Sequence, residues 1–226
     1  MSRRLRAVIF DVDGTLVDSQ DHIAKGVEAA FAALGRDAPG RSDILGIVGL
    51  SLPEAFAVLA PWADAGQNDA LVEAYKASYV KLRAEAGAQS SPLFAGAREM
   101  LERLKGDDHL LLGIATGKSR KGLDILLQAH GLEHFFDDEQ VADHHPSKPH
   151  PAMLEAALKG LGVEKERAVM VGDTSFDMEM AQSAGMKAIG VTWGYHARAR
   201  LKAADRLIDR FEGLPGAMDA LLGEDA

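Results

Sequence analysis

The stretch VIFDVDGTLVDSQ, residues 8–20, decides the fold of this chain. The apolar run at its start, residues 7–10, is typical of a buried parallel strand, because it is short, continuous and followed by a turn signal at Gly14. Asp11 and Asp13 come directly after the run, one residue apart. Such a pair is compatible with a simple turn and with a catalytic site, and only the rest of the chain distinguishes the two.

The composition is that of an ordinary globular protein. The chain has 226 residues, of which 47% are hydrophobic and 26% charged. This length suits one sizeable domain or a domain that carries a smaller insert. The net charge of −9 and the lack of a long basic run argue against a nucleic-acid partner. The absence of cysteine excludes disulfides, thiolate metal sites and cysteine nucleophiles.

The N-terminal stretch lacks the length of a targeting or membrane signal. The apolar run that follows Arg3, Arg4 and Arg6 covers only residues 7–10. It is too short for a signal-peptide core or a transmembrane helix. We therefore expect a cytoplasmic protein without a membrane partner.

The segment after the first strand is predicted to be all-helical. Ser19 or Asp21 can cap a first helix and Gly35 can end it. Further helices are expected over residues 52–59 and 69–86, and residues 88–92 have the composition of a linker. The apolar residues of the first helix recur at spacings of three and four: Ile23, Val27, Ala30, Phe31 and Leu34.

From residue 97 onward, predicted strands and helices alternate. This order favours an α/β fold in which a parallel sheet is covered by helices on both faces. The first strand belongs to that sheet, so residues 17–88 are expected to form a helical domain inserted between core segments 1–16 and 89–226. The expected strands are 110–115, 168–171, 188–191 and 206–208, with 135–136 a short strand or turn; the expected helices are 97–105, 122–130, 151–161 and 178–184.

Polar residues follow the predicted strands at the edge where such sheets bind ligands. Four carboxylates, those of Asp11, Asp13, Asp173 and Asp177, are expected to converge there. Close carboxylates repel one another and raise some of their pKa values, which a hard divalent cation would relieve. An all-oxygen ligand set of this kind suits Mg²⁺.

The remaining polar residues at this edge predict phosphoryl chemistry. Thr116, Gly117 and Lys148 supply a hydroxyl, a backbone amide and a positive charge, which together can hold a phosphate. Asp11 and Asp13 point the same way along an extended segment. Asp11, ionised at neutral pH, can attack phosphorus, while Asp13 can protonate the leaving oxygen and then activate water.

Four motifs resemble those of the haloacid dehalogenase-like hydrolases. DVDGTLVDS (11–19) is similar to that family's first motif, DxDGTxxDS, and ATGK (115–118) to its second. SKPHP (147–151) resembles the lysine motif, and GDTSFDMEMA (172–181) the acidic motif GDxxxDxxxA. The resemblance covers essentially the whole chain. It implies a Rossmann-like core with an inserted helical cap, a Mg²⁺ cofactor and an aspartyl-phosphate intermediate.

The resemblance also implies a role for each matching residue. It makes Asp11 the nucleophile and a metal ligand, and Asp13 the general acid/base, whose carbonyl is a second metal ligand. Asp173 would bind the metal directly or through water. The phosphate-binding residues would be Thr116, Gly117 and Lys148, and the supporting residues Asp177, Gly14 and Thr15.

Within the family, the chain looks most like the phosphoglycolate phosphatase group, on the stretches GVTWGYH (190–196) and LFAGAREMLERLK (93–105). The expected partner is thus a small phosphate ester, and the expected assembly a monomer or weak homodimer. Residues 46–51 are expected to approach the substrate, and their lack of arginine argues against a strongly charged substrate.

Several other residues have weaker signals. Lys118 could contact the substrate, but an exposed lysine at a helix start explains it at least as well. His144-His145 are not expected to bind metal, because adjacent side chains diverge. Trp193 and Tyr195 are compatible with both the cleft and loop packing.

Three alternative functions remain at this stage. A sugar phosphomutase would use the same residues. A haloacid dehalogenase is disfavoured, because a halide leaving group needs no acid at Asp13. A non-catalytic phosphate-binding module is disfavoured because all expected catalytic positions are filled.

Overall fold

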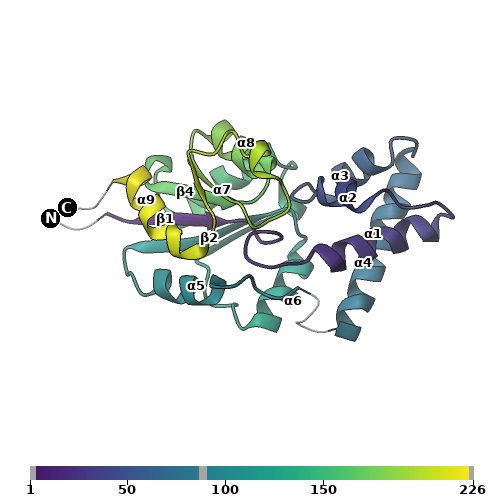
Figure 1. Ribbon diagram of the computed structural model, residues 1–226, viewed down its shortest axis with the longest axis horizontal. Helices are drawn as coiled ribbons and strands as arrows, with labels where there is room; N and C mark the ends of the chain where they lie inside the picture. The colour runs from purple at the N-terminus through teal and green to yellow at the C-terminus, as the bar shows by residue number, and fades with distance from the viewer. Residues whose placement is uncertain (1–3, 87–90, 224–226) are drawn as a thin grey trace.

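The computed structural model describes residues 4–86 and 91–223, and its centre is a six-stranded sheet (Figure 1). The strands lie in the order β3-β2-β1-β4-β5-β6, and every neighbouring pair is parallel. This arrangement confirms the predicted α/β fold. The strand bounds are β1 Arg6–Phe10, β2 Leu110–Thr116, β3 Asp138–Val141, β4 Ala168–Gly172, β5 Lys187–Val191 and β6 Arg206–Ile208.

Strand β1 lies in the middle of the sheet, and all five of its residues are buried. A strand covered on both faces is expected to be continuously apolar rather than alternating. Phe10 lies beside Ile114 of β2 and Val171 of β4. The residues that follow these three strands therefore leave the sheet at one common edge.

Helices cover both faces of the sheet. Val8 and Phe10 pack into a cluster with α5 (Ala97–Lys105), α6 (Arg120–His130) and α9 (Leu214–Leu222). Ala7 and Ile9 point to the other face, where α7 (Ala152–Leu161) and α8 (Ser175–Ala184) lie. The alternation along β1 thus supplies both layers of the core.

Residues 20–86, called here the helical insert, form a separate group of helices at one end of the molecule (Figure 1). They pack around their own apolar cluster, which contains Phe31, Phe56 and Tyr75. The domain division at 17–88 stays a prediction, and residues 87–90 of the linker region lie outside the described residues. The helices are α1 Gln20–Ala33, α2 Arg41–Leu45, α3 Leu52–Leu59 and α4 Ala65–Ala86.

Three elements, β3, α2 and α9, were not expected from the sequence. Strand β3 has the sequence DEQV and lies at the sheet edge, where three of its four residues are only half-buried, so it lacks an apolar pattern. Of the strand or turn expected at residues 135–136, the structure has a turn at Phe135, just before β3. Helix α2 has only five residues, which weakens any periodicity. Among the described helices, none combines the length and apolar character needed to cross a membrane.

The apolar cluster of the helical insert predicts a contrast between two positions on α3. Phe56 is 1% exposed and Val58 is 60% exposed. Phe56→Ala should lower the free energy of unfolding by about 3–5 kcal/mol, because it removes a buried ring and leaves a cavity. Val58→Ala should change it by less than about 0.5 kcal/mol. Urea unfolding measures both, and equal stability of the two variants would contradict the packing described here.

Candidate active site

The turn after β1 is built around Gly14. This residue has φ +86°, a conformation that favours glycine. A Cβ atom placed on Gly14 would lie 2.2 Å from Asp173 Oδ2. The backbone therefore passes directly beside that carboxylate. The neighbouring Thr15 hydroxyl donates a hydrogen bond to Asp173 Oδ1 at 2.9 Å, so two of the three predicted supporting residues, Gly14 and Thr15, lie against Asp173.

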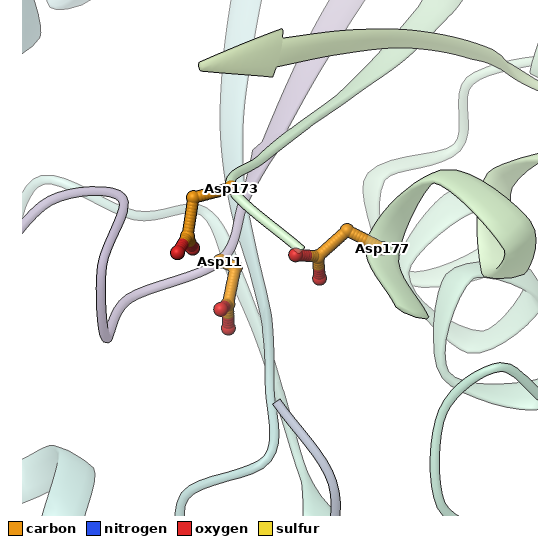
Figure 2. A group of neighbouring side chains, drawn as sticks. All are labelled: Asp11, Asp173 and Asp177. Carbon is orange, nitrogen blue, oxygen red and sulfur yellow. The ribbon is translucent and has the colours of Figure 1, made fainter. Parts of the chain in front are cut away.

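Three buried carboxylates meet at this edge (Figure 2). Asp11, Asp173 and Asp177 come from the ends of β1 and β4 and from the start of α8, and each offers an oxygen within 4.8 Å of the others. Burial raises the pKa of Asp11 to about 6, although the charge of Lys148 opposes the shift. Burial, and then the charges of Asp177 and Asp11, raise the pKa of Asp173 well above its usual value.

This arrangement fits a divalent cation. Both carboxylate oxygens of Asp11 are buried, and neither accepts a hydrogen bond of good geometry from the described residues. Buried polar atoms are normally satisfied, so a buried carboxylate whose positively charged neighbour is Lys148 has room for a further ligand. The donor set consists of oxygens, which suits Mg²⁺ better than a softer metal.

Lys148 is the positive charge of the acidic cluster. Its side chain is fully buried, and Nζ lies 3.0 Å from Asp11 Oδ1 and 2.6 Å from Asp177 Oδ1. Burial alone would lower the pKa of Lys148, but the charges of Asp11 and Asp177 raise it above its usual value. Lys148 therefore stays protonated and can face an incoming anion.

Asp177 belongs to the capping box of α8 and also binds Lys148. Its Oδ2 accepts hydrogen bonds from the Thr174 backbone amide at 3.0 Å and from the Thr174 hydroxyl at 2.7 Å, which completes a capping box at the start of α8. Its Oδ1 accepts from Lys148 Nζ. Both oxygens are thus in use, as the predicted supporting role requires.

Thr116 and Gly117 lie where β2 ends, under the loop of the helical insert. Thr116 is 1% exposed. A Cβ atom on Gly117 would be 2.6 Å from the Gly49 carbonyl oxygen and 2.8 Å from that of Leu50. Residues 49–50 of the insert therefore pack directly on Gly117, one of the expected phosphate-binding residues.

Lys118 is not the exposed lysine that its place near a helix start suggested. It is only 9% exposed, and its Nζ donates to both oxygens of Asp13, at 2.8 and 2.7 Å. Burial alone would lower the pKa of Lys118, but the charge of Asp13 raises it above its usual value. A position near a helix start suggests exposure only when the side chain has no tertiary partner, and Lys118 has one in Asp13.

Ser19 also differs from expectation. It stands at the N-cap position of α1, but its side chain makes no capping hydrogen bond. Its hydroxyl instead donates to Asp13 Oδ1 at 2.6 Å, and its backbone amide donates to the Tyr195 hydroxyl at 2.7 Å. Asp13 and Ser19 belong to the same stretch, DVDGTLVDS, but nothing in the sequence pattern predicts that Tyr195 contacts Ser19.

Trp193 and His145 make local contacts. The Trp193 ring lies beside Phe94 and Phe211, and its Nε1 donates to the Thr15 carbonyl at 3.1 Å. A ring nitrogen of His145 shares a hydrogen bond with Gln140 at 2.8 Å. Within residues 4–86 and 91–223, only the three aspartates form a group suited to a metal ion.

A model of the haloacid dehalogenase-like hydrolases matches residues 8–191. The chain belongs to this family. It is 40% identical over 221 residues to the probable phosphatase IndB of Dickeya dadantii, and the match covers 95% of this chain and 94% of that one. It is 31% identical to a phosphoglycolate phosphatase of Yersinia pestis, over 86% of this chain and 84% of the other.

A solved structure shares the whole architecture. The crystal structure of a predicted phosphatase from Clostridium acetobutylicum has a TM-score of 0.85 and 25% identity, over 96% of this chain and 100% of that one. The family match and this fold likeness confirm the resemblance and the fold predicted from the four motifs. The chain is thus a haloacid dehalogenase-like hydrolase whose acidic residues meet at the carboxyl edge of its sheet.

The raised pKa of Asp11 predicts how stability depends on pH without metal. The folded state holds the Asp11 proton more tightly than the unfolded state, because its pKa rises from 3.8 to about 6. Ionisation of Asp11 therefore costs on the order of 3 kcal/mol, and stability should fall as pH rises through this window. Mg²⁺ should reverse the loss, so its stabilising effect should be larger near pH 8 than near pH 5.

Thermal unfolding with EDTA or Mg²⁺ tests this prediction, with Asp11→Asn as the non-titrating control. The Mg²⁺-induced rise in Tm, and its growth with pH, should both shrink in the variant. Equal Mg²⁺ responses of the two proteins at both pH values would contradict the proposed place of the metal.

Proposed function

We propose that the chain is a Mg²⁺-dependent phosphatase that hydrolyses a small-molecule phosphate monoester through an aspartyl-phosphate intermediate. The observation that carries the proposal is the buried Asp11 carboxylate. Its oxygens accept no hydrogen bond of good geometry from the described residues, and Lys148 lies beside it. A nucleophile aimed at an anionic phosphate needs both an unblocked oxygen and a nearby positive charge. The names of the relatives, which include two phosphatases, support the same activity.

The first half-reaction transfers the phosphoryl group to Asp11. An Asp11 oxygen attacks phosphorus and forms the new P–O bond, while the bond to the leaving oxygen breaks. Asp13 gives its proton to that leaving oxygen, so the product departs as an alcohol. Lys148, with Thr116 and Gly117, would bind the phosphate oxygens.

The second half-reaction releases phosphate. Asp13, now a carboxylate, takes a proton from water, and the water oxygen forms a bond to phosphorus. The bond to Asp11 breaks, which regenerates the carboxylate and yields inorganic phosphate. Lys118 Nζ and the Ser19 hydroxyl donate hydrogen bonds to the Asp13 carboxylate and fix its position for this step.

Asp11, Asp173 and the backbone carbonyl of Asp13 would hold Mg²⁺. The ion would neutralise charge on the phosphate and on the carboxylates around it. Asp177 is less suited to bind it, because its two oxygens already accept hydrogen bonds from Lys148 and Thr174. We therefore keep Asp177 as the residue that orients Lys148.

The nucleophile assignment predicts the behaviour of Asp11→Asn. The variant should lose at least about a thousandfold in kcat, because a neutral amide does not attack phosphorus. Phosphate release with excess Mg²⁺ measures the loss, and circular dichroism shows whether the fold is kept. The exposed Asp108→Asn is the matched control and should retain full activity. Turnover by Asp11→Asn at the wild-type rate would contradict the assignment.

The same assay addresses the alternatives. A phosphomutase would isomerise a sugar phosphate with little release of inorganic phosphate, whereas a phosphatase releases it. Activity that survives exhaustive EDTA treatment would contradict the Mg²⁺ dependence. A lack of hydrolysis over a broad panel of esters would favour a non-catalytic phosphate-binding module.

The contact between Lys118 and Asp13 predicts a dependence on the leaving group. Lys118→Met should lower kcat/KM, which reports on the first half-reaction, by about tenfold to a hundredfold for an alkyl phosphate, because Asp13 loses the group that positions it. The loss should be much smaller for 4-nitrophenyl phosphate, whose leaving oxygen needs no proton. Lys159→Met, at an exposed position of α7, is the control. Equal losses for both esters would show that Lys118 acts only on structure.

A further inference from the structure

A large cavity joins the catalytic edge of the sheet to the helical insert. Its volume is about 1050 Å³, and it begins at Asp11, Asp13 and Gly117. Pockets of this size bind ligands larger than a two-carbon alcohol. The cavity therefore offers far more room than the phosphate group needs.

The cavity is present although the helical insert is in direct contact with the core. The Ser51 backbone amide donates to the Ser147 hydroxyl at 2.9 Å. A ring nitrogen of His196, which follows β5, lies 3.1 Å from the Gly46 carbonyl oxygen. Together with the contact of residues 49–50 on Gly117, these interactions tie the insert to the core. The cavity is thus a space between two parts in contact.

The wall opposite the catalytic residues is apolar and partly aromatic. Helices α1 and α4 and the loop between α2 and α3 supply it. The Tyr75 and Tyr79 rings lie side by side with their centroids 5.8 Å apart. Such a wall suits an apolar or flat ring system. The side chains that matter here are Ile23, Val27, Val48, Leu50, Tyr75 and Tyr79.

The positive charges that line the cavity are already paired or exposed. Lys118 is bound to Asp13, and Arg120 to Glu139. Lys76 is half-exposed and pairs with Glu73. Lys121 lies exposed on α6. Exposed lysines contribute little to binding an anion, and a buried anion without a partner is strongly disfavoured.

We propose that the ester cleaved here has a leaving group with an apolar, ring-bearing face and no second anionic charge. The proposal rests on the phosphatase activity proposed above and names the substrate class of the same site. It departs from the phosphoglycolate-like ester that the sequence resemblance implies. Phosphoglycolate would bring a carboxylate to a wall that has no unpaired buried cation among the described residues.

Four phosphate esters test charge and size separately. Ethyl phosphate and phosphoglycolate are both small, and only phosphoglycolate has a carboxylate. 4-Methylbenzyl phosphate and 4-carboxybenzyl phosphate both contain a ring, and only the second has a carboxylate. With the full chain and excess Mg²⁺, kcat/KM should be at least about tenfold higher for ethyl phosphate and for 4-methylbenzyl phosphate, which lack a carboxylate, than for the carboxylated ester of the same pair. It should also be higher for 4-methylbenzyl phosphate than for ethyl phosphate.

A charge added to the wall provides a second test. Val80 lines the cavity, lies on α4 and is 45% exposed, so Val80→Arg should fold. The new guanidinium should reduce the preference for 4-methylbenzyl over 4-carboxybenzyl phosphate by about threefold or more. Val58→Arg, exposed on α3 outside the cavity lining, should leave the preference unchanged.

The outcomes separate this inference from the proposed function. Equal or higher kcat/KM for either anionic ester, or no gain from the ring, would overturn the inference and leave the phosphatase assignment standing. If no ester is hydrolysed, the phosphatase assignment fails. Calorimetry with 4-methylbenzylphosphonate and 4-carboxybenzylphosphonate then still decides the preference. Tighter binding of 4-methylbenzylphosphonate supports the inference, and equal or weaker binding of it overturns the inference.

Discussion

The structure depends on burying three carboxylates around one lysine. Asp11, Asp173 and Asp177 share a space with Lys148, and all four side chains are almost completely removed from water. One positive charge does not balance three carboxylates, and charges out of water are costly unless they are paired. The carboxylates therefore repel one another, and a divalent cation between them would offset that repulsion. The same excess of negative charge that costs stability in the metal-free protein would favour the binding of such an ion.

The rest of the core keeps these charges in place. Strand β1 is buried on both faces, which leaves Asp11 no freedom to reach solvent at the strand end. Gly14 lets the chain turn so closely that the Asp173 carboxylate fills the space of a missing side chain. Thr174 fixes Asp177 through the capping box, and Asp177 in turn holds Lys148. Each of these features is ordinary alone, and together they prevent the carboxylates from relaxing apart.

The sequence predicted the parts of this arrangement that follow from local pattern. Apolar runs gave β1, β2, β4, β5 and β6, and parallel pairing brought Asp11, Thr116 and Asp173 to one edge. Strand β3 could not be predicted from its polar sequence, because its pairing with β2 rather than its composition makes it a strand.

Lys118 and Ser19 were misread for a related reason. Local pattern placed both at helix starts, whereas their side chains bind Asp13. A pattern along one segment contains no information about a partner that is distant in the chain, such as Lys118 for Asp13 or Tyr195 for Ser19. Contacts of this kind follow only from the three-dimensional fold.

These contacts connect the acid/base residue to the helical insert. Asp13 accepts hydrogen bonds from Ser19, which immediately precedes α1, and from Lys118, whose Nζ lies 5.2 Å from the centroid of the Tyr79 ring on α4. A movement of the insert would therefore disturb the proposed acid/base residue as well as Gly117, on which residues 49–50 lie. The buried charged groups come from the core, whereas the apolar surface that faces them comes from the insert. An ester that spans this boundary is oriented by the contrast between the two, because its phosphate and its leaving group each match only one side.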